Sequence, residues 1–312
     1  MSTSSDIYAA VSKHYSAASS ARTSSGKYES RVAQAFGYSE EELSSIPAEA
    51  NLGLSCGNPT ALAKLREGEI VLDLGCGAGF DVFLASPKVG ESGCVIGVDM
   101  NDDMLEKARK NAKTMNNGEG AKNVRFVKAP ITDMKSGVEN ATVDCIISNC
   151  VVNLVPEAEK PLVFKEMHRV LKSGGRVAIS DILIKDEKQL PEDLQKDMGL
   201  YVGCIAGASL VSGYEKYLKA AGFQDILIVD KNYDLNVYND DGETNGEAKS
   251  CCGPAPAQAK SCCGPAPAPT TKSCCGTTTE TNGNGVQTTN IDLKKLDFNA
   301  YAGSYNIYAV KA

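Results

Sequence analysis

Residues 70–80, IVLDLGCGAGF, decide the fold of this chain. An apolar, strand-like run carries Asp73 near its end, and Gly75, Gly77 and Gly79 follow at alternate positions. Glycines at this spacing allow a tight turn and let a ligand approach the backbone closely. The G-x-G-x-G spacing differs from the G-x-G-x-x-G of dinucleotide-binding folds. The stretch predicts a strand, a ligand-binding turn and a helix, although an ordinary strand–helix turn that uses glycines only for packing would give the same pattern.

A second strand-like run supports the ligand-binding interpretation. It lies in VIGVDM at residues 95–100, so that Asp99 closes the strand. A carboxylate at this point of an α/β sheet can accept hydrogen bonds from both hydroxyls of an adenosyl ribose. The glycine turn and Asp99 together predict a site for an adenosyl cofactor at one edge of the sheet.

Short apolar runs alternate with amphipathic stretches through most of the chain. The expected strands are residues 70–74, 94–99, 124–128, 143–148, 176–181, 225–229 and 304–311. The expected helices lie around residues 80–87, 102–115, 156–172, 191–203 and 213–221. Strands that alternate with helices indicate an α/β fold with a largely parallel sheet covered on both faces.

The two ends of the chain differ from this alternating core. Residues 1–55 have a polar, helical pattern, and Ser39 followed by Glu42 has the spacing of a capping box, so a short helix is expected there. Residues 239–290 contain too few large apolar side chains to offset the entropy of ordering. We expect this linker to be disordered, and a last strand within residues 291–312 to complete the core of residues 56–238.

Composition excludes several classes of function. The chain has 312 residues, and Lys+Arg of 32 against Asp+Glu of 39 give a net charge of -7, which disfavours nucleic acid as a partner. No apolar run is long enough to span a membrane, and the N-terminus lacks a signal-peptide pattern, so we expect a cytoplasmic protein without membrane contact. The 12 cysteines are then expected to be mostly thiols. The chain contains only 2 histidines, which disfavours a histidine-based zinc site.

Three cysteines are predicted to meet at the carboxyl edge of the sheet, where open parallel sheets bind ligands. Cys150 directly follows the fourth strand, Cys56 precedes the first strand in a loop bounded by glycine and proline, and Cys204 lies after the fifth strand. Each thiol taken alone is equally well explained as a small buried apolar side chain. The other core cysteines lie in the glycine turn or in strands and are interpreted as packing residues: Cys76, Cys94 and Cys145.

The glycine turn, Asp99 and EMHRVLKSGGRVAISD at residues 166–181 resemble the class I S-adenosylmethionine methyltransferases. The resemblance implies a Rossmann-like, mostly parallel seven-stranded sheet with helices on both faces, in which the last two strands form an antiparallel pair. It also implies S-adenosylmethionine as the cofactor. Two roles are open for Asp81: it could contact the methionine end of the cofactor, or it could cap the following helix. The residues implied to bind the cofactor are Asp73, Gly75, Gly77, Gly79, Asp99, Met100, Ile131 and Asn149.

A more specific resemblance covers most of residues 28–230. NLGLSCGNP at 51–59, SNCVVNL at 148–154 and GCIAGA at 203–208 are similar to segments of the arsenite methyltransferases. The resemblance implies that Cys56, Cys150 and Cys204 are the catalytic thiols and bind trivalent arsenic. Many members of that family carry a further cysteine nearer the N-terminus for a disulfide relay, and this chain has no cysteine before Cys56.

The chemistry of arsenic agrees with this set of thiols. Trivalent arsenic is soft and prefers thiolates to oxygen or imidazole ligands. Three sulfurs leave its lone pair to attack a sulfonium methyl group, so catalysis is mostly positioning, and electrons from thiols must then reverse the oxidation of arsenic. The expected activity is a detoxifying transfer of methyl groups to arsenite or its thiol conjugates, giving mono- and further methylated arsenicals, with glutathione or thioredoxin as reductant.

The predicted linker contains a repeat of adjacent cysteines. KSCCGPAPA occurs at residues 249–257 and 260–268, and KSCCG at 272–276. Adjacent thiols chelate thiophilic ions, and a neighbouring lysine favours the thiolate. We interpret the repeat as an accessory arsenic or heavy-metal site, although a repeat-expanded loop with incidental thiols is the other interpretation. Its cysteines are Cys251, Cys252, Cys262, Cys263, Cys274 and Cys275.

Two alternative functions stay open at this level. The same cofactor domain could act on another small molecule, such as a sterol or a quinone, which would leave the three core thiols without a role. The chain could instead be a thiol-rich metal-buffering protein with a relic of a methyltransferase domain. Against this alternative, the glycine turn and Asp99 are intact.

Overall fold

The computed structural model describes residues 3–20, 26–188, 190–195, 197–239 and 296–312. Its centre is a seven-stranded sheet in the order β3-β2-β1-β4-β5-β7-β6, in which β7 pairs antiparallel with both neighbours and the other pairs are parallel. The strands are β1 (Ile70–Leu74), β2 (Cys94–Asp99), β3 (Val124–Lys128), β4 (Val143–Asn149), β5 (Leu171–Ile184), β6 (Phe223–Asp230) and β7 (Ala302–Lys311). The predicted class I methyltransferase sheet, with an antiparallel last pair, is confirmed.

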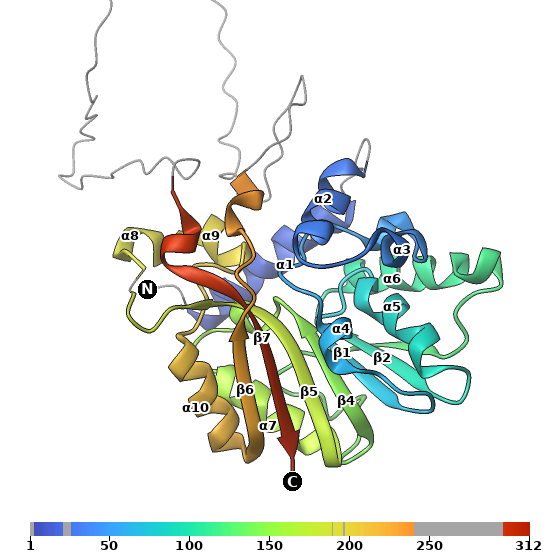
Figure 1. Cartoon of the computed structure of the whole chain (residues 1–312). Coiled ribbons are helices and arrows are strands. Elements are labelled where there is room, and N and C mark those ends of the chain that lie inside the picture. The colour runs from blue at the N-terminus through green and yellow to red at the C-terminus, as the bar shows by residue number, and fades with distance from the viewer. Residues whose placement is uncertain (1–2, 21–25, 189, 196, 240–295) are drawn as a thin grey trace, which may run out of the picture.

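Helices cover both faces of the sheet (Figure 1). Side chains alternate along each strand, so Leu72 of β1 faces the cluster that contains α7 and α10, while Val71 faces the cluster that contains α4, α5 and α6. The helices in chain order are α1 (Ser4–Ser20), α2 (Lys27–Ala35), α3 (Glu40–Ser44), α4 (Pro59–Ala63), α5 (Phe80–Val89), α6 (Asp102–Thr114), α7 (Lys160–Val170), α8 (Glu192–Gln195), α9 (Met198–Val202) and α10 (Val211–Ala221).

A third apolar cluster lies over the carboxyl edge of the parallel strands. It joins Val11 of α1 and Phe36 after α2 to Leu200 of α9 and to the ends of β5 and β7. Figure 1 shows α1, α2, α8 and α9 at this upper edge, while the C-terminus lies at the opposite end of the sheet. The N-terminal helices therefore close the edge at which the sequence predicts ligand binding.

The predicted capping box is present. The Ser39 hydroxyl accepts from the Glu42 amide, and the Glu42 carboxylate accepts from the Ser39 amide, both at 3.1 Å. Since all these groups lie within one helical turn, local sequence is enough to specify the start of α3.

Several expected elements have different bounds, and three of them differ for a clear local reason. The helix expected at 191–203 is two helices, because the Asp197 carboxylate accepts from the Leu200 amide at 2.8 Å and caps a new helix, α9. α7 begins only at Lys160, with Pro161 in its first turn. β5 begins at Leu171 rather than at 176, because Leu171 pairs with Val143 and the intervening glycine turn forms an irregularity in the ladder.

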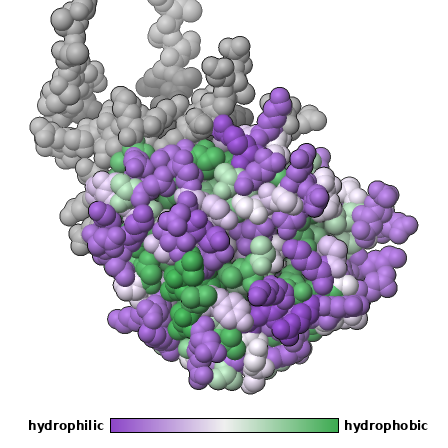
Figure 2. Space-filling model, in the orientation of Figure 1, coloured by the Kyte–Doolittle hydropathy of each residue, from purple (hydrophilic) through white to green (hydrophobic). Residues whose placement is uncertain are grey.

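An apolar area lies over the edge of the sheet formed by β6 (Figure 2). Leu227 and Val229 of the edge strand β6 are exposed there, while the alternating Ile226 and Ile228 pack toward the core. Among the helices of the described ranges, none is both long and apolar enough to cross a membrane. The paired-cysteine repeat and the predicted disorder of the linker lie outside the described residues.

Candidate active site

A cavity lies at the carboxyl ends of β1, β2 and β4, under α1. Almost all the residues assigned to cofactor binding line it: Asp73, Gly75, Gly77, Asp99, Met100, Ile131 and Asn149. Gly79 is the exception. It precedes α5 at φ 93°, and an added Cβ would lie 2.5 Å from the buried Phe83 ring, so this glycine serves the turn and the packing of the helix.

Gly77 has the geometry expected of a glycine that faces a ligand. Its φ is 51°, and a Cβ added to it would meet no atom within 4 Å. Its amide donates to the Asp99 carboxylate at 2.9 Å, and the other Asp99 oxygen accepts from the Asn101 amide at 2.9 Å. The predicted turn and the predicted acid are therefore joined directly, and each carboxylate oxygen retains a lone pair for a ligand hydroxyl.

Asp81 lines the cavity and does not cap α5, because Gly79 occupies the capping position. Its carboxylate accepts from the Tyr38 hydroxyl at 2.7 Å and from the Asn149 amide at 3.1 Å. Burial raises the pKa of Asp81 to about 6, against the lowering effect of these two donors. Burial also raises the pKa of Asp73 well above its usual range, with Asp81 and Asp99 adding to the shift.

Three carboxyl groups in one largely buried cavity favour a cationic ligand, because a nearby positive charge stabilises their ionised forms. S-adenosylmethionine carries a sulfonium and an ammonium group as well as a ribose. Asp73, Asp81, Asp99 and the open space at Gly77 thus fit the charge and shape of this cofactor.

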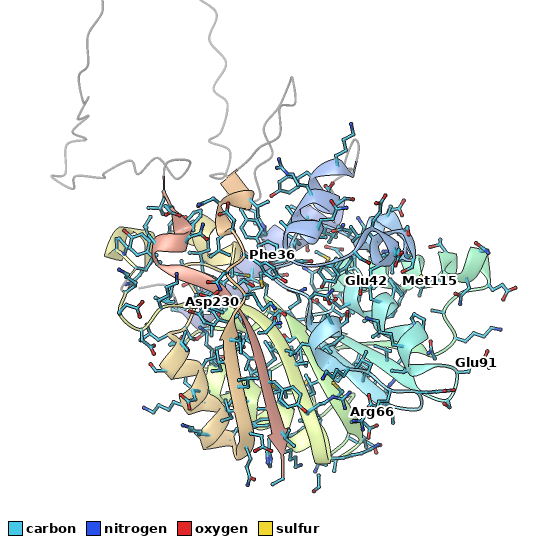
Figure 3. The ribbon with its side chains drawn as sticks, in the orientation of Figure 1. Phe36, Glu42, Arg66, Glu91, Met115 and Asp230 are labelled. Atoms are coloured by element: carbon cyan, nitrogen blue, oxygen red, sulfur yellow. A yellow bond between two sulfur atoms is a disulfide. The ribbon has the colours of Figure 1, made fainter. Side chains whose placement is uncertain are left out.

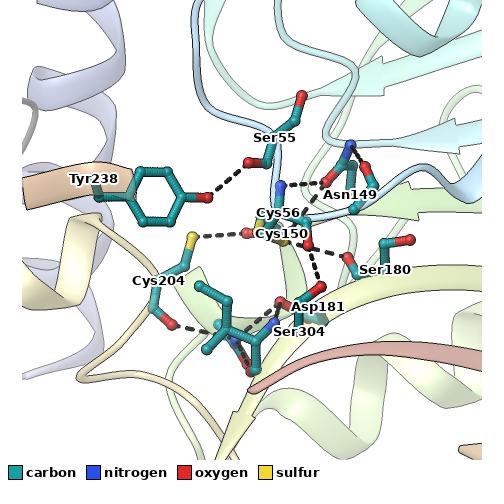
Figure 4. The surroundings of a disulfide bond; sticks show 12 residues. Ser55, Cys56, Asn149, Cys150, Ser180, Asp181, Cys204, Tyr238 and Ser304 are labelled. Carbon is teal, nitrogen blue, oxygen red and sulfur yellow. Dashed lines mark hydrogen bonds between the residues drawn. A yellow bond between two sulfur atoms is a disulfide. The ribbon is translucent and has the colours of Figure 1, made fainter. Parts of the chain in front are cut away.

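The predicted thiols meet beside this cavity (Figure 4). Cys56 and Cys150 form a disulfide with their Cα atoms 6.0 Å apart, while Cys76, Cys94, Cys145 and Cys204 are thiols. The Cys204 thiol donates to the Cys150 carbonyl at 2.9 Å. A carboxylate oxygen of the buried Asp181 and the two bonded sulfurs all lie within 4.8 Å of one another. Cys150 also lines the cavity, so the thiols adjoin the place predicted for the cofactor.

The loop of Cys56 is held on several sides. The Cys56 amide donates to the Asn149 side chain at 3.1 Å, and the Cys56 carbonyl accepts from the Ser304 hydroxyl of β7. The Tyr238 hydroxyl donates to the Ser55 carbonyl at 2.6 Å, and the Tyr238 ring stacks on Phe36 at 5.3 Å between centroids. Figure 3 shows Phe36 above the upper end of the sheet, where α2 and the segment before the linker converge. Elements from both ends of the chain therefore fix this thiol.

Two of the three thiols have an uncommon backbone conformation. Cys150 has φ 58° and Cys204 has φ 67°, in the left-handed region that residues with a Cβ seldom adopt. Such backbone strain concentrates at functional sites, because only a functional arrangement or strong surrounding contacts retain it. The conformation separates these cysteines from ordinary packing cysteines.

Asn153 and Asp181 connect the loops that carry the thiols. The Asn153 amide donates to the Asp181 carboxylate at 2.8 Å and to the Cys204 carbonyl at 3.2 Å, and both side chains are fully buried. Burial raises the pKa of Asp181 to about 7, while the nearby Lys160 lowers it. Neither residue is predicted from the sequence to have a role, although Asn153 lies inside SNCVVNL and Asp181 inside EMHRVLKSGGRVAISD.

Tyr38 and Cys76 are further residues at the site that the sequence does not predict there. Tyr38 is fixed between Asp81 and Asn149, and no short motif around it signals this contact. Cys76 was interpreted as a packing residue, and it is buried, but it also lines the cavity. Burial raises the pKa of its thiol well above the usual range, with Asp99 adding to the shift, so Cys76 is a poor nucleophile.

Arsenite methyltransferases are among the curated relatives of this chain. An arsenite methyltransferase of Halobacterium salinarum is 43% identical over 216 residues, which are 69% of this chain and 53% of that protein. An arsenite methyltransferase of Aquipseudomonas alcaligenes is 34% identical over 200 residues, which are 61% of this chain and 57% of that protein. The chain thus spans about half the length of these relatives.

The solved structures agree on the fold. The arsenic (III) S-adenosylmethionine methyltransferase of Chlamydomonas reinhardtii superposes with a TM-score of 0.52 at 24% sequence identity, over 90% of this chain and 73% of that one. The family model described as a methyltransferase domain matches residues 65–240. That match covers more than half of the chain and contains the glycine turn, Asp99 and two of the three thiols, so the chain belongs to the methyltransferase domain family.

Proposed function

We propose that this protein transfers methyl groups from S-adenosylmethionine to trivalent arsenic bound by Cys56, Cys150 and Cys204. The substrate is arsenite or its thiol conjugate, and the products are mono- and further methylated arsenicals. The proposal depends mainly on one observation: Cys56 and Cys204, from two other loops, both contact Cys150. Cys150 also lines the cavity that contains the three carboxyl groups. The arsenite methyltransferases among the relatives support the same assignment.

Each part of the site then has a role. The Gly75–Gly77 turn and Asp99 hold the adenosyl part of the cofactor, and Asp73 and Asp81 face its positive charges. Tyr38 and Asn149 fix the Asp81 carboxylate. The bound cofactor supplies an electrophilic methyl group. The thiolates hold arsenic with its lone pair toward the cavity, so positioning replaces a general base.

Cys56 and Cys150 can also supply the electrons that reduce the methylated arsenic. Arsenic loses two electrons formally when it gains a methyl group, and a dithiol that closes to a disulfide returns two. Cys56 and Cys150 lie at disulfide distance, and a thiol reductant such as glutathione or thioredoxin would reopen them. A reducing cytoplasm would supply this reductant, and the pair would serve without a cysteine nearer the N-terminus.

The test is methylation with radiolabelled S-adenosylmethionine, arsenite and a thiol reductant, followed by separation of the arsenicals. We expect arsenic-dependent product from the wild type and none from Cys150→Ser. Cys94→Ser is the matched control, because Cys94 starts β2 at the opposite end of the sheet, and it should retain product formation. Measurable cofactor binding without any methylated arsenical would overturn the proposal.

Neither of the two alternative functions, methylation of another small molecule or metal buffering, explains both the thiols and the cofactor cavity. A sterol or quinone acceptor leaves the converging thiols and the strained backbone of Cys150 and Cys204 unexplained. Metal buffering leaves the cavity with three carboxyl groups unexplained.

A further inference from the structure

The segment that carries Cys204 is held differently from the loop of Cys150. Cys150 directly follows β4, and its amide donates to the Ser180 carbonyl of β5 at 2.9 Å. The Cys204 amide donates instead to the Tyr201 carbonyl of α9, in its own segment, at 3.0 Å. The Cys204 thiol faces the Cys150 carbonyl from this separate segment (Figure 4). Its place relative to the other two thiols therefore depends on contacts between the segment and the sheet.

Asn153 makes such a contact. It lies in the short helix η3 (Val152–Leu154), which follows β4. Its side-chain amide donates to the Asp181 carboxylate at 2.8 Å and to the Ile182 carbonyl at 2.6 Å, both in β5. The same nitrogen donates to the Cys204 carbonyl at 3.2 Å. One side chain thus joins the end of β5 to the backbone of the third thiol.

The Asn153 side chain acts here as a donor. It is fully buried, and within the part of the chain that the structure describes its Oδ1 atom has no hydrogen-bond partner. A buried carbonyl without a partner costs free energy, so a residue that retains one needs a reason. The acceptors on Asp181 and on the Cys204 carbonyl supply that reason, because a donor between them links the two segments.

A second buried side chain holds the same segment further along. Lys160 of α7 donates to the Gly207 carbonyl and, at 2.8 Å, to the Ser209 hydroxyl. A Cβ added to Gly207 would clash with the Asn153 carbonyl oxygen, so the segment lies directly against η3. The stretch from Cys204 to Ser209 is therefore fixed at two points, with Asn153 at the end that carries the thiol.

We propose that Asn153 is a positioning residue for the arsenic site, which holds the Cys204 carbonyl at the end of β5 and thereby keeps the Cys204 sulfur within reach of arsenic on Cys56 and Cys150. The inference rests on the proposed function. Arsenite bound by two thiolates keeps one hydroxyl group. The Cys204 thiol replaces it: an As–S bond forms, the As–O bond breaks, and the thiol proton leaves with the hydroxide as water. This last exchange needs Cys204 in place, whereas binding by the first two thiols does not.

The test compares Asn153→Asp with Asn123→Asp in the full chain. Each change replaces an amide that donates to backbone carbonyls by an acceptor of the same shape. Asn123 donates to the Ser86 and Gly90 carbonyls at 2.9 and 2.8 Å, beside the start of β3 and away from the thiols. Asn153→Ala is the second variant, because it removes the same donor without adding a charge next to Asp181.

Alkylation of each cysteine is followed peptide by peptide by mass spectrometry. In the first arm the Cys56–Cys150 disulfide is closed and arsenite is absent, so the rate at Cys204 reports how often its segment opens. Cys76 and Cys145 are buried and report opening of the whole domain. In the second arm the protein is reduced and arsenite is present, and steady-state kinetics and cofactor affinity are measured in parallel.

In the first arm, Cys204 should react about tenfold faster in both Asn153 variants, while Cys76 and Cys145 keep their wild-type rates. In the second arm, arsenite should still protect Cys56 and Cys150 but no longer Cys204. The KM for arsenite should rise about tenfold, and cofactor affinity should change less than about twofold. Asn123→Asp should match the wild type in both arms.

A wild-type rate at Cys204 in both Asn153 variants overturns the inference. Equal acceleration of Cys204, Cys76 and Cys145 also overturns it, because the change then acts on the whole domain and not on one segment. If arsenite protects none of the wild-type thiols, the proposed function itself fails, and the first arm still shows whether Asn153 holds the Cys204 segment.

Discussion

Asp81 has its carboxyl group between Tyr38 and Asn149 at the wall of the cofactor cavity, and burial raises its pKa to about 6. A cationic cofactor favours the ionised carboxylate, so its affinity should fall as the pH drops below about 6 and level off above it. Binding near this pH should release protons. Asp81→Asn should remove this pH dependence of the affinity and weaken cofactor binding at neutral pH by about tenfold or more.

Titration calorimetry from about pH 5 to about pH 8, in two buffers of different ionisation enthalpy, checks this prediction. Asp102→Asn is the control, because Asp102 is an exposed carboxylate in the first turn of α6 that pairs with Lys128. The control should keep the step near pH 6. The interpretation of Asp81 is wrong if its asparagine variant binds with the wild-type pH dependence.

At the scale of elements, the start of α5 depends on Gly79. An alanine there would have φ 93° and would press its Cβ against the buried Phe83 ring. Gly79→Ala should lower the free energy of unfolding by about 2–4 kcal/mol. Gly174→Ala separates the two causes, because Gly174 has φ 77° but open space around the added Cβ, and it should cost only about 1–2 kcal/mol. Urea unfolding measures both variants, and equal losses would contradict the packing role of Gly79.

At the scale of the whole molecule, the cofactor site and the paired-cysteine repeat should be separable. Asp99→Ala removes the acceptor of the Gly77 and Asn101 amides and should abolish cofactor binding and methylation while metal loading of the repeat persists. Deletion of residues 249–276 should remove the metal loading and keep methylation within about twofold, as expected for an accessory site that is independent of the core. Equilibrium dialysis of the cofactor and elemental analysis of bound arsenic test both. Loss of methylation on deletion would show that the repeat takes part in turnover.

Much of this protein is determined by its sequence alone. The alternating apolar runs specify seven strands, the glycine turn at Gly75 and Gly77 specifies a cavity, and Ser39 with Glu42 specifies a helix start, because each depends on residues within one turn or one strand. The placement of Asp99 beside Gly77 also follows from the sequence, since adjacent parallel strands end at the same edge.

The sequence predicted that three thiols meet above that edge, but only the tertiary structure decided how they pair and which other side chains join them. Cys56 and Cys150 are 94 residues apart, and their pairing depends on the path of the loop before β1 over the end of β4. The contacts of Asn153 with Asp181 and with the Cys204 carbonyl likewise join separate segments of the chain. No local pattern encodes such contacts, because the strand order and the paths of the loops set their distances. The sequence thus determined the sheet and its cofactor turn, and the docked loops and helices decided the arrangement of the thiols.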